Sequence, residues 1–128
     1  MWRLFQPGGG DEQATARPGP KTADTDGDQA IVCARCRLRI TSAGARIDVA
    51  GSHVHECVNP HGFRWRIGCF AVAEGLVVVS EPEAHWSWFP GYTWEIENCA
   101  GCRELLGWRY RSGDSSFHGL ILPHLVDG

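Results

Sequence analysis

The sequence of 128 residues has no run of like charge and no long apolar segment. Its 12 basic and 15 acidic residues give a net charge of −3, a pattern that suits neither nucleic-acid phosphates nor an anionic lipid surface. No apolar run approaches the roughly 20 residues of a membrane span. The N-terminal residues also lack the apolar core, about 7 to 15 residues long, of a secretory signal. We therefore expect a soluble cytoplasmic protein whose partners include neither nucleic acid nor a membrane.

Helical periodicity is absent as well, apart from a short stretch at residues 70–74. Residues 1–29 are rich in Gly, Pro, Thr and Asp and offer little to bury, so they are predicted to be a disordered tail. Residues 30–126 consist of short alternating segments separated by Gly, Asn and Pro, which is typical of antiparallel strands. A chain of this length supports one modest core. The prediction is a single all-β domain.

Alternating side chains indicate which strand faces are apolar. In residues 63–67, the apolar side chains share one face, and Arg64 and Arg66 share the other. The same period places Leu106, Trp108 and Tyr110 on a common face. Residues 77–79 form a continuous apolar run, which predicts a buried strand.

Four of the six cysteines form two Cys-x-x-Cys turns, here called the knuckles. Two such turns supply four thiolates for a tetrahedral zinc ion, so we expect one structural zinc held by Cys33, Cys36, Cys99 and Cys102. Disulfides fit poorly with the expected reducing compartment. Cys57 and Cys69 lie outside this spacing and are interpreted as small buried hydrophobic residues.

A second concentration of unusual residues lies between Trp88 and Tyr110, where three tryptophans flank the second knuckle. Pro90 and Gly91 have the order that a type II turn prefers, which would bring Trp88 and Trp94 together. Such aromatic rings can form a core, or a cage for a small flat or saturated ring or for a methylated ammonium group. Composition alone leaves these alternatives open.

The residues also carry a family resemblance, over about residues 30–125. The sequence Ser87-Trp88-Phe89-Pro90-Gly91-Tyr92-Thr93-Trp94, the two knuckles, Asn59-Pro60-His61-Gly62 and Leu106-Gly107-Trp108-Arg109-Tyr110 resemble the thalidomide-binding domain of cereblon, the CULT domain. The similarity is greater to the single-domain bacterial homologues than to the full eukaryotic protein. The resemblance implies a β-tent, in which two antiparallel sheets meet at roughly a right angle and are pinned by a four-cysteine zinc site.

The resemblance also implies a ligand site. Trp88, Trp94 and Trp108 would be the walls of an aromatic cage, with Tyr110 at its base. The carbonyl of Trp86 and the amide of Trp88 would bind a cyclic imide, and the further binding residues would be Ser87, Phe89, Asn59, Pro60 and Trp65. The implied ligands are glutarimide, thalidomide-type compounds, dihydrouracil- or uridine-like rings, or a C-terminal cyclic imide of a protein, all bound without turnover.

Several residues depart from the family pattern. Trp86 replaces a His, and because its contact is through the backbone the imide bonds should persist. Tyr110 replaces Phe and adds a hydroxyl group. The sequence has neither the Lon-like domain nor the ubiquitin-ligase adaptor segment of cereblon, so we do not expect a ligase-receptor role for this chain.

Two other functions fit the sequence less well. Methionine sulfoxide reductases of the B type resemble this fold and its knuckles, but this chain has no Cys after Cys102 to act as nucleophile. Readers of methylated ammonium usually add a carboxylate to the cage, whereas Glu95 should point away from Trp94. His53 and His55 could share a metal, but with no third ligand nearby they are interpreted as solvated side chains.

Overall fold

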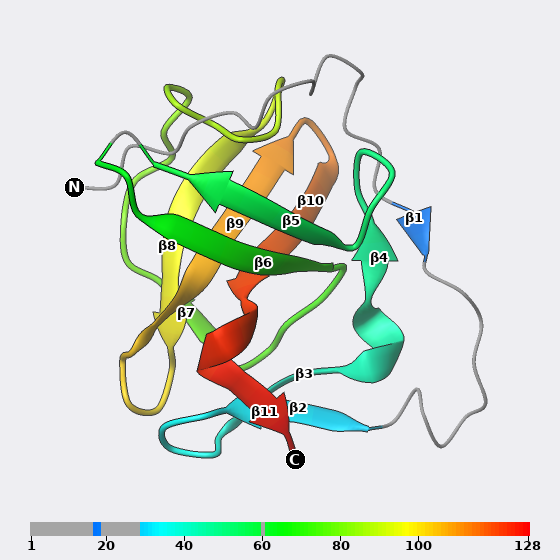
Figure 1. Cartoon of the computed structure of the whole chain (residues 1–128), viewed down its shortest axis with the longest axis vertical. Coiled ribbons are helices and arrows are strands. Elements are labelled where there is room, and N and C mark those ends of the chain that lie inside the picture. The colour runs from blue at the N-terminus through cyan, green and yellow to red at the C-terminus, as the bar shows by residue number, and fades with distance from the viewer. Residues whose placement is uncertain (1–16, 19–28, 60) are drawn as a thin grey trace.

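The computed structural model describes residues 17–18, 29–59 and 61–128, and within them the chain is all-β (Figure 1). Strands account for all regular structure there except two short 3-10 helices, η1 (Ala43–Ala45) and η2 (Leu122–His124). The predicted fold class is confirmed. The helix considered at residues 70–74 is wrong, because Phe70 ends a strand and the chain then bends toward Gly75. No helix of the described residues is long and apolar enough to cross a membrane.

The larger sheet is antiparallel and has the strand order β5–β6–β10–β9–β8–β7. Its strands are β5 (Val54–Val58), β6 (Arg64–Phe70), β7 (Leu76–Val78), β8 (Thr93–Cys99), β9 (Leu105–Ser112) and β10 (Ser115–Ile121). Sequential hairpins account for most of these neighbours, and the β6–β10 pairing joins residues far apart in the sequence. This pairing joins the β5–β6 hairpin to the strands that follow the second knuckle.

The smaller sheet has the order β11–β2–β3 and lies below the larger sheet in Figure 1. It comprises β2 (Ala30–Cys33), β3 (Arg39–Ser42) and β11 (Leu125–Asp127). Two further strands, β1 (Arg17–Pro18) and β4 (Ile47–Asp48), pair with each other. Strand β1 and Gln29 fall within the segment predicted to be disordered, and the other residues of that segment lie outside the described residues.

Two clusters of buried apolar residues form the core. The first contains most of the aromatic residues and lies on one face of the larger sheet. The second joins the two sheets and includes Ile31 and Ile40 from the smaller sheet and Phe70 and Leu120 from the larger one. Cys57 and Cys69 are fully buried in the first cluster, as predicted.

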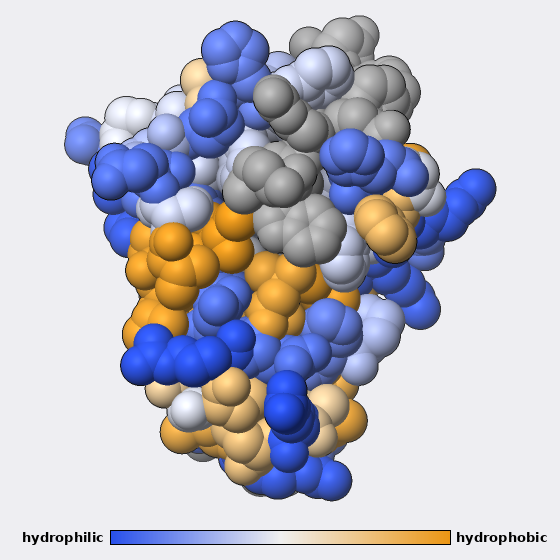
Figure 2. All heavy atoms as spheres, turned by 90° about the vertical axis from the view of Figure 1, so that its left-hand side faces the viewer, coloured by the Kyte–Doolittle hydropathy of each residue, from blue (hydrophilic) through white to orange (hydrophobic). Residues whose placement is uncertain are grey.

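The environment of strand β7 differs from the predicted one. The strand forms, but it lies at the edge of the larger sheet, with Val78 40% exposed and Val79, just beyond it, 49% exposed. The prediction of a buried strand is therefore wrong, because an apolar run does not distinguish an edge strand from a central one. Figure 2 shows an apolar area among hydrophilic residues on the side of the molecule where β7 and β8 lie.

Gly107 allows the two central strands to approach closely. A Cβ atom at Gly107 would collide with the carbonyl oxygen of Gly119 on β10 and lie 2.9 Å from the Cα of Leu120. Both contacts are with backbone, which cannot move without disturbing the β9–β10 pairing. The glycine at this position is therefore required by the packing of the sheet.

We expect Gly107→Ala to lower the free energy of unfolding by about 2 kcal/mol or more, because overpacking against backbone forces the strands apart. Urea unfolding followed by tryptophan fluorescence measures this change. Gly113→Ala is the matched control, since a Cβ there meets nothing within 4 Å and only the positive φ of 60° opposes it. Equal losses in the two variants would show that close approach is not the constraint at Gly107.

Candidate functional site

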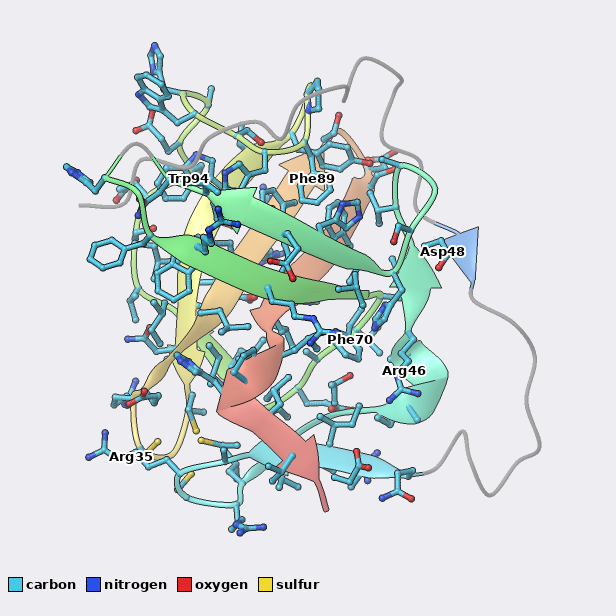
Figure 3. All side chains as sticks on the ribbon, in the orientation of Figure 1. Arg35, Arg46, Asp48, Phe70, Phe89 and Trp94 are labelled. Carbon is cyan, nitrogen blue, oxygen red and sulfur yellow. The ribbon has the colours of Figure 1, made fainter. Side chains whose placement is uncertain are left out.

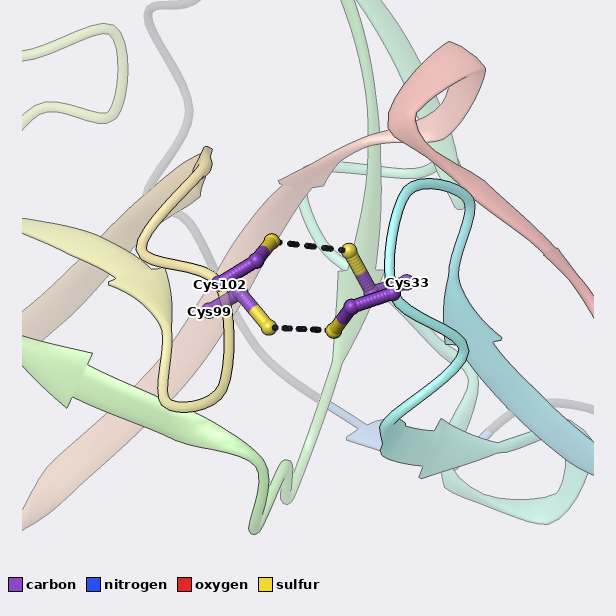
Figure 4. A group of neighbouring side chains, drawn as sticks. Cys33, Cys99 and Cys102 are labelled. Carbon is purple, nitrogen blue, oxygen red and sulfur yellow. Dashed lines mark hydrogen bonds between the residues drawn. The ribbon is translucent and has the colours of Figure 1, made fainter.

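Four cysteines from the two knuckles come together between the sheets (Figure 4). Cys33 ends β2 and Cys99 ends β8, and Cys36 and Cys102 follow in the turns. All four Sγ atoms lie within 4.8 Å of one another. The Sγ atoms of Cys33 and Cys102 are 3.7 Å apart, and those of Cys36 and Cys99 are 3.5 Å apart. The predicted convergence of the four residues is confirmed.

This geometry fits a metal ion such as zinc. Zn–S bonds of about 2.3 Å in a tetrahedron place the sulfur atoms about 3.8 Å apart, close to the two distances observed. The backbone amide of Gly101 donates to Cys99 Sγ at 3.3 Å, which favours negative charge on that sulfur. The backbone amide of Glu104 likewise favours the thiolate of Cys102, but desolvation and the neighbouring thiols raise the pKa of Cys102 to about 11. A cation at the centre would offset this cost by stabilising the thiolates.

The two knuckles have the same backbone hydrogen bonds, a symmetry that the sequence analysis missed. The amide of Cys33 donates to the carbonyl of Leu38, and the amide of Cys99 donates to that of Glu104. The residue after each second cysteine then takes a positive φ, 71° at Arg37 and 69° at Arg103. This left-handed conformation costs a non-glycine residue about 1–2 kcal/mol. Both knuckles have the sequence Cys-x-x-Cys-Arg, and this repetition could have indicated their common backbone geometry.

The three tryptophans of the predicted cage gather on the aromatic face of the larger sheet. Trp94 and Trp108 lie on the same face of neighbouring strands β8 and β9, since Trp94 pairs with Tyr110 and Ile96 pairs with Trp108. Trp88, from the loop before β8, meets Trp108 edge to face, with ring centroids 5.2 Å apart. All three are nearly buried, with exposed fractions of 1% for Trp88, 3% for Trp94 and 0% for Trp108.

The loop between residues 84 and 93 carries the predicted imide-binding backbone. An antiparallel bridge between Glu83 and Trp94 closes its base, and the indole N–H of Trp94 donates to the carbonyl of His85 at 2.7 Å. At its tip the amide of Tyr92 donates to the carbonyl of Phe89, and Gly91 has a φ of 86°. These are the features of the type II turn predicted from Pro90 and Gly91. The loop is therefore fixed against Trp94, one of the tryptophans of the predicted cage.

Aromatic rings also form the base of this region. Tyr110 and Phe89 are buried and meet edge to face, with ring centroids 4.8 Å apart. Phe117 on β10 stacks on Tyr110 with centroids 5.1 Å apart, a residue that the sequence analysis did not include. The alternation of Phe117 with Gly119 along β10 could have placed Phe117 on the same face from the sequence. The indole nitrogen of Trp108 and the hydroxyl of Tyr110 are buried without a hydrogen-bond partner in the described part of the chain.

The remaining predicted binding residues, apart from Pro60, differ in their burial and in their contacts. Trp86 is 43% exposed and has a φ of 65°, so a strained residue provides the carbonyl expected to accept from the imide. The hydroxyl of Ser87 donates to the carbonyl of Phe89. Trp65 meets Trp108 edge to face at 5.6 Å. Asn59 is buried, and its side-chain oxygen accepts from the amides of His61 and Phe63. Pro60 lies outside the described residues.

Other polar residues are separated from this region. Glu95 lies opposite Arg109 across the β8–β9 pair and so faces away from Trp94, as predicted. His53 Nδ1 lies 3.1 Å from the carbonyl oxygen of Ile47, and His55 Nε2 lies 2.9 Å from that of Val49. The two histidines therefore contact separate backbone carbonyls, and neither the metal-sharing nor the fully solvated interpretation describes them. The four cysteines are the only metal-capable cluster of three or more such residues in the described ranges.

The comparisons with known proteins relate this chain to cereblon. No family model matches it. Protein cereblon of Danio rerio and that of Gallus gallus are each 38% identical over 53 residues, which is 41% of this chain and 12% of each relative. Protein cereblon of Drosophila simulans is 30% identical over 70 residues, 53% of this chain and 11% of the relative. The matches thus span only about an eighth or less of the relatives' length, and the predicted resemblance to a cereblon-like, CULT-type domain is confirmed.

We expect Cys99→Ser to unfold or strongly destabilise the domain, because a structural metal contributes its binding energy to folding. Metal analysis of the unmodified protein should find one zinc per chain. Cys57→Ala is the matched control and should retain the metal, since Cys57 lies in the aromatic cluster and not at the knuckles. A folded Cys99→Ser protein without zinc would contradict the metal assignment.

The backbone of the knuckles makes a separate prediction. Arg37→Gly should raise the free energy of unfolding by about 1 kcal/mol, because glycine adopts a positive φ without steric cost. Arg39→Gly, two residues later on β3, should instead lower it by about 0.5–1 kcal/mol, because glycine weakens a strand. Thermal unfolding of the metal-loaded variants distinguishes the two signs. A loss of stability in both variants would exclude backbone strain at Arg37.

Proposed function

We propose that this domain binds a cyclic imide or a related ring between Trp88, Trp94 and Trp108, and releases it unchanged. The observation that carries the proposal is the attachment of the 84–93 loop to the aromatic face through the Trp94 to His85 hydrogen bond of 2.7 Å. It fixes the chain at His85, directly before residues 86–88, whose backbone donors and acceptors would face the ligand in this proposal. The similarity to cereblon proteins supports a substrate-receptor type of domain.

The chemistry of the region suits a small, uncharged, partly saturated ring. Indole faces accept the CH groups of such a ring, and backbone amides and carbonyls satisfy its polar edge. The unpartnered indole N–H of Trp108 and hydroxyl of Tyr110 are two further groups that a bound molecule or water could satisfy. Glutarimide, dihydrouracil-like rings and the C-terminal cyclic imide of a protein all have this form, and a protein bearing such a terminus would be the corresponding protein partner.

Binding without turnover fits the thiol chemistry. The free thiols outside the knuckles, Cys57 and Cys69, are fully buried, and desolvation raises the pKa of both well above that of an ordinary thiol. Such thiols are poor nucleophiles. A methionine sulfoxide reductase of the B type would need a nucleophilic cysteine after Cys102. Strand β10 in this region carries Phe117 and His118 and no cysteine. The proposal includes a single structural zinc at the four cysteines and a reducing, cytoplasmic compartment in which these thiols stay unpaired.

We expect glutarimide and thalidomide to bind with micromolar affinity, about −8 kcal/mol, and to quench tryptophan fluorescence. The N-methyl imide should not bind, because the methyl group removes the donor to the Trp86 carbonyl and collides with the loop. Trp94→Phe should weaken binding at least tenfold while the zinc content stays unchanged. Trp86→Ala is the matched control: it retains the backbone carbonyl and should change affinity for the bare glutarimide ring less than threefold.

The low exposure of the three tryptophans also fits a simple core, and the same experiment distinguishes the two. If the tryptophans form a cage, Trp94→Phe weakens imide binding with little change in the free energy of unfolding. If they form only a core, Trp94→Phe lowers the free energy of unfolding and the unmodified protein does not bind the imide. Equal binding of free and N-methyl imide, or of trimethyl-lysine, would contradict the proposed recognition.

A further inference from the structure

A hollow lies at the seam between the two sheets, on residues that do not belong to the aromatic region. Its volume is about 390 Å³, within the range of small-molecule sites. Figure 3 shows Arg46 and Phe70, two of its lining residues, well below Trp94 and Phe89 of the aromatic region. The smaller sheet contributes Ile31 and β11, and the larger sheet contributes β5 and β6.

The walls of the hollow are apolar and closely packed. Ile31, Phe70 and Leu125 are buried there, and Val54 and Leu122 are partly buried. Gly68 allows the wall to close, because a Cβ at that position would lie 2.8 Å from Leu122 Cδ2 and 3.0 Å from His53 Nε2. These surfaces offer an apolar ligand group burial on several sides.

Three polar residues also line the hollow: His53, Arg46 and Asp127. Desolvation lowers the pKa of His53, whose ring also packs edge to face on Phe70 with centroids 5.2 Å apart. Arg46 and Asp127 are exposed, and neither forms an ion pair with any described residue. The hollow therefore presents one exposed positive group and one exposed negative group, neither of them in an ion pair, beside an apolar wall.

We propose that this seam hollow binds a free hydrophobic α-amino acid such as leucine. Its carboxylate would pair with the Arg46 guanidinium, its ammonium group with the Asp127 carboxylate, and its side chain would pack against Phe70, Ile31 and Leu125. A fatty carboxylic acid would leave Asp127 unpaired, and an alkyl amine would leave Arg46 unpaired. The zwitterion satisfies both charges, and this site does not depend on the proposed imide site.

The test is a titration of the zinc-loaded full chain followed by amide NMR shifts and calorimetry. The probes are L-leucine, 4-methylpentanoic acid, which lacks the ammonium group, and 3-methylbutylamine, which lacks the carboxylate. We expect leucine to bind at least fivefold more tightly than either analogue and to shift the amides of Val54 and Val126. Arg46→Gln and Asp127→Asn should each weaken leucine binding at least fivefold.

Matched controls are Arg64→Gln and Asp114→Asn, which remove exposed charges from residues that do not line the hollow. Both should bind leucine as the unmodified protein does, and so should the protein saturated with glutarimide. The proposal is overturned if leucine does not saturate the protein, if the three probes bind alike, or if the control variants lose as much affinity as the two charge variants. Loss of glutarimide binding alone would instead refute the imide site.

Discussion

The attachment of β2 to β8 through four cysteines is the constraint on which the rest of the structure depends. The knuckles are more than sixty residues apart in sequence, since the sulfur contacts join positions separated by 63 and 69 residues. Apolar packing between a three-stranded and a six-stranded sheet is otherwise limited to the smaller of the two core clusters. Fixing the two sheets at this corner lets a small domain hold its aromatic face rigid without a large core, which is a common role of metals in domains of this size.

The aromatic face follows from strand geometry. Because side chains alternate along β8, β9 and β10, Trp94, Trp108 and Phe117 all project to one side, while Glu95, Arg109 and His118 project to the other. On that other side His118 Nδ1 lies 2.8 Å from the carboxylate of Glu97, whose side chain is only 3% exposed. One sheet thus separates apolar rings from paired charges. The residues packed around the tryptophans on this face are apolar, which in the proposed site favours a neutral imide over a methylated ammonium group.

Much of this arrangement could be predicted from the sequence, because it depends on short-range patterns. The knuckle spacing, the Pro90-Gly91 turn and the alternation around Trp108 each involve neighbouring residues, and the structure bears out all three. The exposure of Val78 could not be predicted, because the position of a strand within its sheet depends on long-range pairing. The backbone contacts of His53 and His55 depend likewise on β4 and the turn after it, and the seam hollow on the approach of two sheets.

Trp86 adopts a positive φ within the loop of the proposed site. In the proposed site, recognition depends on the direction of the Trp86 carbonyl, which is set by the backbone of a loop closed by the Glu83–Trp94 bridge. The left-handed conformation costs energy, and the closed loop and its type II turn supply the constraint that maintains it. The side chain of Trp86 is 43% exposed. In the proposed site, the direction of the Trp86 carbonyl therefore depends on the closure of the loop as a whole.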